Sequence, residues 1–296
     1  MVVLMKKFIF SLSVISSVIL SSNANAVIIR EDTFSLEQSE KYAKKITSTG
    51  EVFAQFNKNA GGEIGSSVLI SPNHVLTAAH LVHAGIDIKN AMANFAPKGQ
   101  DFGPSTTRVN CKVIVNPEHG MDKNGNCNGV DLAILEFPDP IVAHDVVKLY
   151  ADPIKDNSQF YIAGYGYSGY NKTGATKNCD TRLMGTTRIT SQDRQYLTHE
   201  FTPYKPFDGS RPTTFEIEEG MDPMQALLTL RDSGGPLLTK KPGEKIYSVA
   251  GIYHGMQVVP DMGIAIQQWI PIAPNIPWIN SVINRKGPLK SADEKR

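Results

Sequence analysis

The sequence lacks an excess of either charge, because 30 Lys and Arg residues stand against 29 Asp and Glu residues. A chain this close to neutral has no broad basic surface for nucleic acid, so we expect no nucleic-acid-binding function. Low-complexity segments and short-period repeats are absent too. The one basic stretch, "KGPLKSADEKR" (286–296), is interpreted as a polar, solvated tail.

Long apolar runs are missing, except at the start of the chain. Lys6 and Lys7 precede "FIFSLSVISSVIL", and "SSNANA" follows with small residues at Ala24 and Ala26. This order predicts a secretory signal peptide over residues 1–26, cleaved after Ala26. A membrane anchor is the alternative, but the run is too short to span a bilayer. We therefore expect a bacterial secreted or periplasmic protein with no membrane contact after cleavage, and a mature charge of 28 − 29 = −1.

Cysteine is scarce, with three residues at positions that do not suit a zinc site. Export permits disulfides to form. With three cysteines, one is left without a partner in the same chain, or pairs with a cysteine of another chain. We expect Cys111 to pair with Cys127, because both precede one predicted strand and the bond would close a loop near it. Cys179 is then the remaining thiol.

Long helical periodicity is absent from most of the chain. Short runs such as "SSVLIS", "CKVIVN", "DLAILEF" and "YSVAGIY" alternate with Gly, Pro, Asn and Asp, which is typical of strands. Residues 27–49 form a polar lead-in or propeptide-like segment with a helical turn or two. The rest predicts an all-β fold of two antiparallel barrels, about 50–150 and 158–272, followed by a C-terminal helix at about 276–285.

One serine stands in a setting suited to covalent chemistry, within "LTLRDSGGPLL" (228–238). A serine hydroxyl is a weak nucleophile, so Ser233 needs a base within reach and a third group that orients the base. His80 ends the apolar run "HVLTAAH", where small neighbours leave its ring open. Asp131 begins the apolar run "DLAILEF", so it is expected to be partly buried and in need of a hydrogen-bond partner.

In this order the motifs resemble those of the trypsin/chymotrypsin-like serine proteases. "LTAAH" is similar to the histidine motif of that family, "VDLAILEF" to its aspartate strand and "DSGGPL" to its serine loop. "SSVLIS", "IAGYGYSG", "VAGIYHG" and "PWINSVI" are similar to further elements in the same order. The resemblance runs from about Gly50 to Arg285 and implies a fold of two six-stranded barrels.

The resemblance also implies an activity. Ser233 attacks a peptide carbonyl, His80 moves the proton and Asp131 orients His80. No metal or organic cofactor is implied, the partner is a protein or peptide substrate, and we expect a monomer. The alternatives are a non-enzymatic binding protein on the same fold and a zymogen-like form.

The family's oxyanion hole uses the backbone N–H groups of the serine and of the residue two before it. These are Ser233 and Arg231 here, and the family normally has glycine at the second place. Arg231 keeps an N–H donor, but a Cβ in a glycine-type backbone conformation costs about 1–3 kcal/mol. A flipped peptide would remove the donor, and one such donor is typically worth about 10²–10³ in rate.

The acid before the serine pairs, in the family, with a freshly cut amino terminus. Signal cleavage would leave Val27 as an apolar terminus that could insert beside Asp232. A later cut within residues 30–50, or a substituting lysine, is the alternative.

Residue preference is read from the pocket wall that the resemblance implies. Leu227 and Leu228 would form its base, which argues against basic side chains and favours a large apolar residue before the scissile bond. A glutamate preference through His254, or support of Asp131 by that histidine, is the alternative. The expected facing wall comprises Tyr253, His254, Gly255, Met256 and Gly263.

Overall fold

The structure is a computed structural model that describes residues 27–56, 62–82, 88–96, 107–108, 111–122, 127–142, 144–178, 181–206 and 211–285. The predicted signal peptide, Cys179 and the polar tail lie outside these residues. None of the described helices has the length and the apolar run needed to cross a membrane.

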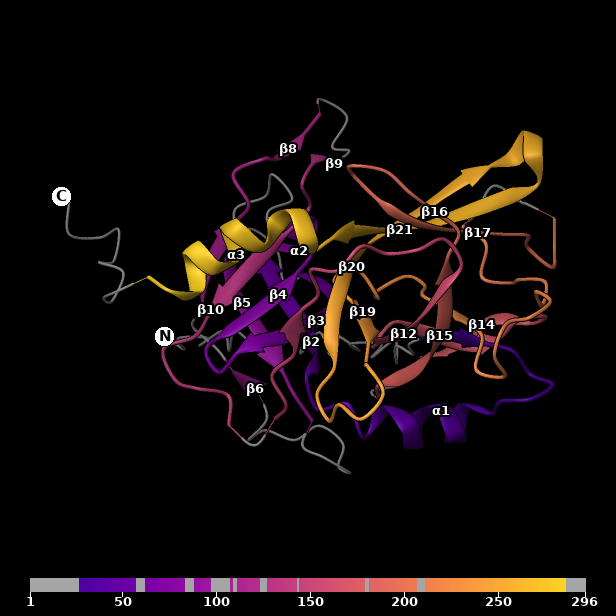
Figure 1. Cartoon of the computed structure of the whole chain (residues 1–296), viewed down its shortest axis with the longest axis horizontal. Coiled ribbons are helices and arrows are strands. Elements are labelled where there is room, and N and C mark those ends of the chain that lie inside the picture. The colour runs from indigo at the N-terminus through magenta and orange to yellow at the C-terminus, as the bar shows by residue number, and fades with distance from the viewer. Residues whose placement is uncertain are drawn as a thin grey trace, which may run out of the picture.

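Two curled sheets make up the two halves of the molecule, and they appear at the left and right of Figure 1. The first sheet has the order β6-β5-β2-β3-β4-β10-β7. Its strands are β2 (Thr49–Phe56), β3 (Gly62–Ser71), β4 (His74–Thr77), β5 (Ile88–Asn94), β6 (Thr107–Arg108), β7 (Lys112–Val115) and β10 (Ala133–Glu136).

The second sheet has the order β15-β12-β19-β20-β21-β17-β16, and β11 pairs with β20 off this path. Its strands are β11 (Lys148–Leu149), β12 (Ser158–Gly164), β15 (Leu183–Ile189), β16 (Ser191–Gln192), β17 (Leu197–Phe201), β19 (Pro236–Thr239), β20 (Ser248–Val259) and β21 (Ile264–Pro271). The predicted all-β fold with two barrel-like halves is confirmed. Each path holds seven strands where six were expected.

A third sheet carries the described amino-terminal end. It has the order β14-β13-β1-β18, made of β1 (Ile28–Ile29), β13 (Tyr167–Tyr170), β14 (Gly174–Asn178) and β18 (Ala226–Leu227). Because β1 lies between β13 and β18, the chain after Val27 is an interior strand of this sheet. A short hairpin of β8 (His119–Met121) and β9 (Cys127–Gly129) lies apart from it.

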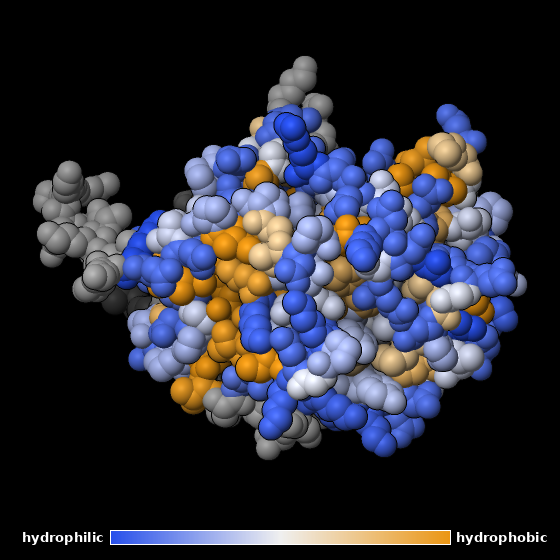
Figure 2. All heavy atoms as spheres, in the orientation of Figure 1, coloured by the Kyte–Doolittle hydropathy of each residue, from blue (hydrophilic) through white to orange (hydrophobic). Residues whose placement is uncertain are grey.

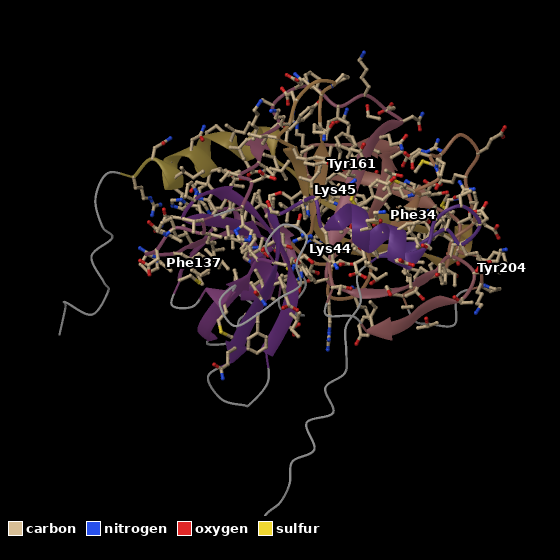
Figure 3. The ribbon with its side chains drawn as sticks, turned by 90° about the horizontal axis from the view of Figure 1, so that it is seen from below. Phe34, Lys44, Lys45, Phe137, Tyr161 and Tyr204 are labelled. Carbon is tan, nitrogen blue, oxygen red and sulfur yellow. The ribbon has the colours of Figure 1, made fainter. Side chains whose placement is uncertain are left out.

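The lead-in continues as α1 (Leu36–Ala43), which packs against β15 and crosses the face seen in Figure 3 between Phe34 and Lys44. Ser35 and Gln38 form a capping box at its start, which satisfies backbone N–H groups that a helix leaves unpaired. Ser39 then binds the backbone of Met184 in both directions, at 2.6 and 3.0 Å. The lead-in is therefore a packed part of the body.

The remaining helices are α2 (Ala79–Val82), the 3₁₀ turns η2 (Pro260–Met262) and η3 (Ala273–Asn275), and α3 (Ile276–Ile283). Ile279 and Val282 of α3 are buried in the core of the first half, so the predicted C-terminal helix docks there. In Figure 2, apolar residues gather beside α3, while hydrophilic residues cover most of the rest of this face.

Candidate active site

The antiparallel pairing of β4 with β10 brings His80 and Asp131 together. Ala133 lies opposite Thr77, so the end of β4 meets the start of β10. His80 follows β4 on α2, and Asp131 precedes β10. The His80 backbone N–H donates to Asp131 Oδ1 at 2.8 Å, and His80 Nδ1 lies 2.6 Å from Asp131 Oδ2. The predicted pair is therefore held at two points.

Asp131 is fully buried and serves more than one imidazole. His254 Nδ1, from β20, lies 2.6 Å from the same Oδ2 atom. The buried ring of His119 approaches Oδ1, with its Nδ1 at 3.7 Å. The sequence offered support of Asp131 by His254 as an alternative to glutamate binding, and the short contact favours that alternative.

Burial alone would raise the pKa of Asp131, but the hydrogen bonds from His254 and His80 hold it well below its usual range. The carboxylate is then ionised and acts only as an acceptor, so Nδ1 of His80 carries its hydrogen and Nε2 is left to accept a proton. Burial alone would lower the pKa of His80, and the hydrogen bond to Asp131 and the contact with Cys127 raise it above its ordinary value.

Ser233 is held in place by backbone contacts with both halves of the molecule. Its carbonyl accepts the N–H of Ser66 in β3 at 2.7 Å, and the next N–H, of Gly234, donates to Tyr253 in β20 at 2.8 Å. Gly234 has a φ of +83°, and a Cβ there would collide with the carbonyl oxygen of Ser66. Glycine is therefore required directly after the serine.

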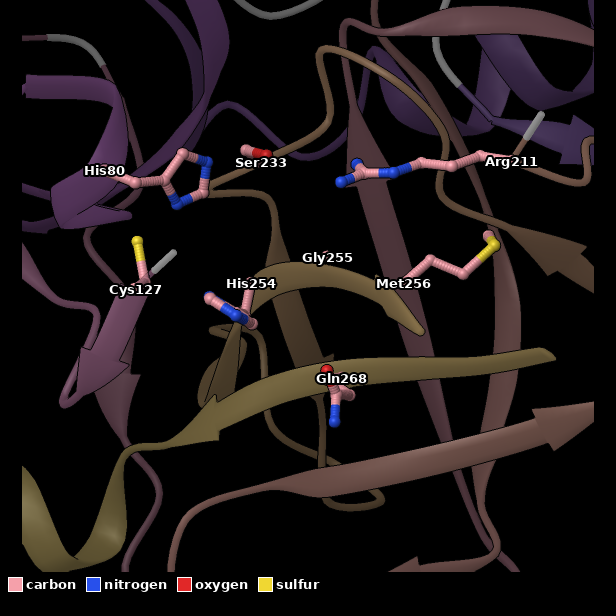
Figure 4. A pocket seen from close by; sticks show the side chains of 8 residues that line it. All are labelled: His80, Cys127, Arg211, Ser233, His254, Gly255, Met256 and Gln268. Atoms are coloured by element: carbon pink, nitrogen blue, oxygen red, sulfur yellow. The ribbon is translucent and has the colours of Figure 1, made fainter. Parts of the chain in front are cut away.

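Ser233 and His80 line one cleft of about 290 Å³, together with Cys127, Arg211, His254, Gly255, Met256 and Gln268 (Figure 4). Within the part of the chain that the structure describes, no hydrogen bond joins His80 to Ser233. Catalytic hydrogen bonds are often long before substrate binds and tighten in the complex. The structure thus brings the predicted serine, histidine and aspartate to one place.

Arg231 adopts the backbone conformation that glycine favours, with a φ of +69°. The carbonyl of Leu230 accepts the N–H of Tyr167 at 3.1 Å. Since the carbonyl and the N–H of one peptide point in opposite directions, this bond fixes the direction of the Arg231 N–H. The guanidinium lies 5.3 Å from the ring of Tyr167, a cation–π contact that offsets part of the backbone strain.

Asp232 points away from the cleft into the protein. Its carboxylate accepts the N–H groups of Gly166 at 2.8 Å and Thr229 at 2.7 Å, and also that of Val27. Burial raises the pKa of Asp232 to about 7, although these three donors lower it. Val27 is fully buried. The structure therefore brings together the two residues predicted to pair on activation.

Not all of the predicted specificity residues line the cleft. His254, Gly255 and Met256 line the cleft, and Tyr253 lines an adjoining hollow of about 40 Å³. The placement of the others needs correction, since Leu227, Leu228 and Gly263 line neither space.

The two leucines lie in the interior because β18, which contains Leu227, pairs with β1. Ile28 lies opposite Leu227, and both leucines pack in apolar clusters. Gly263, with a φ of +65°, ends the η2 turn of the β20–β21 hairpin.

The predicted disulfide is wrong for this structure, in which Cys111 and Cys127 are free cysteines. Cys111 donates to the carbonyl of Ala91 at 3.2 Å, in the first sheet, and Cys127 starts β9 at the rim of the cleft. His80, Cys127 and Asp131 each offer an atom within 4.8 Å of the others. Both Asp131 oxygens already accept hydrogen bonds, so we assign no metal to this cluster.

Three residues of the cleft, Cys127, Arg211 and Gln268, were not predicted from the sequence to line it. Cys127 was assigned to a disulfide, and nothing local to Arg211 indicates a role. The side chain of Arg211 extends along the cleft toward Ser233 in Figure 4, although the two residues are 22 positions apart.

Comparison with known proteins gives the same architecture. A family model described as Trypsin matches residues 42–279. The solved "Structure of GrC" has a TM-score of 0.55 at 13% identity, covering 82% of this chain and 96% of that chain. "Kallikrein-related peptidase 10" has a TM-score of 0.51 at 18% identity, covering 81% and 96%. At these identities the two structures show a shared fold. No curated protein matches the chain.

Proposed function

The chain belongs to the trypsin family, and we propose that it is a secreted serine endopeptidase that acts through Ser233, His80 and Asp131. The observation that carries the proposal is the buried carboxylate of Asp131, 2.6 Å from Nδ1 of His80, in a cleft that Ser233 also lines. Once it is deprotonated, an imidazole held in this way presents Nε2 as a base to its open side.

In the proposed reaction, Ser233 Oγ attacks the carbonyl carbon of the scissile peptide bond, and His80 Nε2 accepts the hydroxyl proton. Asp131 stabilises the imidazolium that results. His80 then gives the proton to the leaving amine, and an acyl-enzyme remains. A water molecule, deprotonated by His80, hydrolyses this ester and restores the free serine.

The tetrahedral intermediate needs donors for its negative oxygen. We assign this task to the backbone N–H groups of Ser233 and Arg231, as the sequence predicts. The positive φ of Arg231 supports the assignment, since arginine here keeps the backbone shape of the usual glycine. This observation favours the enzyme over the binding-protein alternative, which depended on a spoiled hole.

Signal cleavage is the proposed activating event. Val27 has a φ of +72°, an uncommon conformation that is strained for a β-branched residue preceded by a peptide bond. Cleavage after Ala26 removes that peptide bond and its strain. It also converts the Val27 N–H beside Asp232 into an ammonium group, which can pair with the buried carboxylate.

The predicted apolar preference before the scissile bond stays a prediction. Met256 lines the cleft, but the two leucines on which the prediction depended lie in the core.

A fluorophosphonate probe tests the proposed function, because it phosphonylates only a serine that is activated by its neighbours. We expect the protein that begins at Val27 to be labelled, and Ser233→Ala and His80→Ala to remain unlabelled. Mass spectrometry of the labelled peptide should locate the adduct on Ser233. An unlabelled protein with a verified Val27 amino terminus would refute the proposal.

A further inference from the structure

We propose that Arg211 makes this protein select an acidic residue immediately before the scissile bond. The inference rests on the proposed peptidase function and names its substrate class. From the sequence, the residue preference was assigned to Leu227 and Leu228, or to His254. It is assigned here to Arg211, which nothing in the sequence indicated.

The hollow beside Ser233 has the position that a substrate side chain needs. It is lined by Thr229, Leu230, Arg231 and Ser233 of the serine loop and by Tyr253, Gly255 and Met256 of β20. Arg211, Pro212 and Thr213 line it as well. Because the serine and the proposed oxyanion donors form one wall, a peptide bond poised at Ser233 directs its preceding side chain into this space.

The main cleft and the hollow share part of their lining, including Arg211. Four residues line both spaces, namely Arg211, Ser233, Gly255 and Met256. Figure 4 shows the Arg211 side chain reaching from the far wall toward Ser233. We therefore expect a substrate side chain that enters the hollow to lie beside Arg211.

The charge around the two spaces has one sign. Arg211 and Arg231 both line the hollow, and no Asp or Glu is among the residues that line either space. A lysine or arginine side chain would enter without a partner and against two cations. A carboxylate would instead meet the planar, forked donors of a guanidinium, which match its two oxygens.

Arg211 differs from the arginines that serve the fold. Arg30 pairs with Asp32, Arg188 pairs with Glu218, and Arg182 donates to backbone carbonyls. Among the described residues, no carboxylate forms an ion pair with Arg211. Its charge is directed into the substrate space, where an incoming anion can bind it.

The test is a matched series of internally quenched peptides that differ only in the residue before the scissile bond: Glu, Gln, Asp, Asn, Leu, Phe and Lys. Glu and Gln have nearly the same shape, so their kcat/KM ratio isolates the charge. We expect Glu to exceed Gln by about 10–100-fold, the range of one charge-assisted hydrogen bond. Because Arg211 is exposed, the ratio should fall as salt is raised.

Two variants assign the effect to this residue. Arg211→Gln should bring the Glu to Gln ratio close to one, and Arg211→Glu should favour Lys. Arg285→Gln removes the same charge at an exposed position just after α3 and should keep the wild-type ratio. Fluorophosphonate labelling of each variant reports whether its serine is still assembled, so a misfolded variant is recognised.

The two proposals fail in different ways. A wild-type protein that does not label overturns the peptidase assignment. A wild-type protein that labels, but cleaves Gln, Leu or Lys peptides as well as the Glu peptide, overturns the role of Arg211 alone. A strong Glu preference that survives in Arg211→Gln also overturns it and moves the charge recognition to Arg231 or His254.

Discussion

A single alanine before Val27 should strongly reduce peptide hydrolysis while leaving the protein folded. The comparison is between a chain that begins at Val27 and one that begins at Ala26. Both bury Val27, Ile28 and Ile29 completely and both keep the Val27 N–H beside Asp232. They differ in where the terminal ammonium group lies, because only in the shorter chain is it on Val27, beside Asp232.

The magnitude follows from the burial of Asp232. Without an ammonium partner, burial raises its pKa from 3.8 to about 7. A rise of about 3 units corresponds to a cost of about 4 kcal/mol for holding the carboxylate ionised above pH 7. Removing one partner of a buried ion pair costs about 3–5 kcal/mol, which is the same range. Because Asp232 lies between the proposed oxyanion donors Arg231 and Ser233, we expect kcat/KM to fall by about 10²–10³-fold.

The pH dependence of stability separates the two chains. In the chain that begins at Ala26, the folded-state pKa of Asp232 is raised, so stability is greatest below about pH 4 and declines as pH rises to about 7. In the chain that begins at Val27, the ammonium depresses the pKa of Asp232. Its contribution is then present above about pH 4 and is lost only when the amino group deprotonates, above about pH 8.

Urea unfolding at pH 4.5 and 7.5, with peptide hydrolysis at pH 7.5, measures both effects. Asp232→Asn in the chain that begins at Val27 is the control, since it removes the carboxylate and leaves the terminus. Equal activity of the two chains, with parallel pH profiles of stability, would refute the pairing.

Three further outcomes follow from the site. His254→Phe keeps a ring beside Tyr196 but removes a donor to Asp131, so the carboxylate interacts more strongly with His80. The acidic limb of the pH–kcat/KM profile should then move to higher pH, and an unchanged limb would deny the contact a role. Arg231→Gly relieves a strained φ and should raise the free energy of unfolding by about 1 kcal/mol, with peptide hydrolysis retained. A loss of fluorophosphonate labelling would instead show that the arginine itself shapes the oxyanion hole. A thiol reagent such as methyl methanethiosulfonate should inactivate the wild type by modifying Cys127 beside His80, and the Cys127→Ser variant should keep its activity. Equal inactivation of both proteins would place the reactive thiol elsewhere.

The fold and the meeting of the three candidate side chains could be predicted because their signals are local. "HVLTAAH" and "DLAILEF" are short apolar strands whose ends carry the functional residue. Once β4 and β10 pair in antiparallel register, His80 and Asp131 meet without further information. The glycines around Ser233 likewise meet a local need, since Gly234 adopts a positive φ against the backbone of Ser66.

The specificity pocket could not be predicted in this way, because long-range packing decides which side of a segment faces the cleft. Leu227 and Leu228 were assigned by their distance from Ser233 along the chain. The insertion of β1 beside β18 takes them into the interior, and a segment 22 residues before Ser233 closes the pocket instead. The predicted disulfide was wrong for a related reason, since Cys111 contacts the first sheet through Ala91, whereas Cys127 belongs to the separate β8–β9 hairpin.

The amino-terminal strand connects these observations. Three fully buried apolar side chains, at about 1.5–3 kcal/mol each, contribute about 5–9 kcal/mol to its insertion. That contribution does not depend on cleavage, so the strand is held between β13 and β18 in either form. The ammonium adds a charge at the end of a strand already in place, directly beside the serine loop. Export cleavage is therefore expected to change the loop chemistry more than the fold, which is why activity, and not secondary structure, is the measurement that distinguishes the two chains.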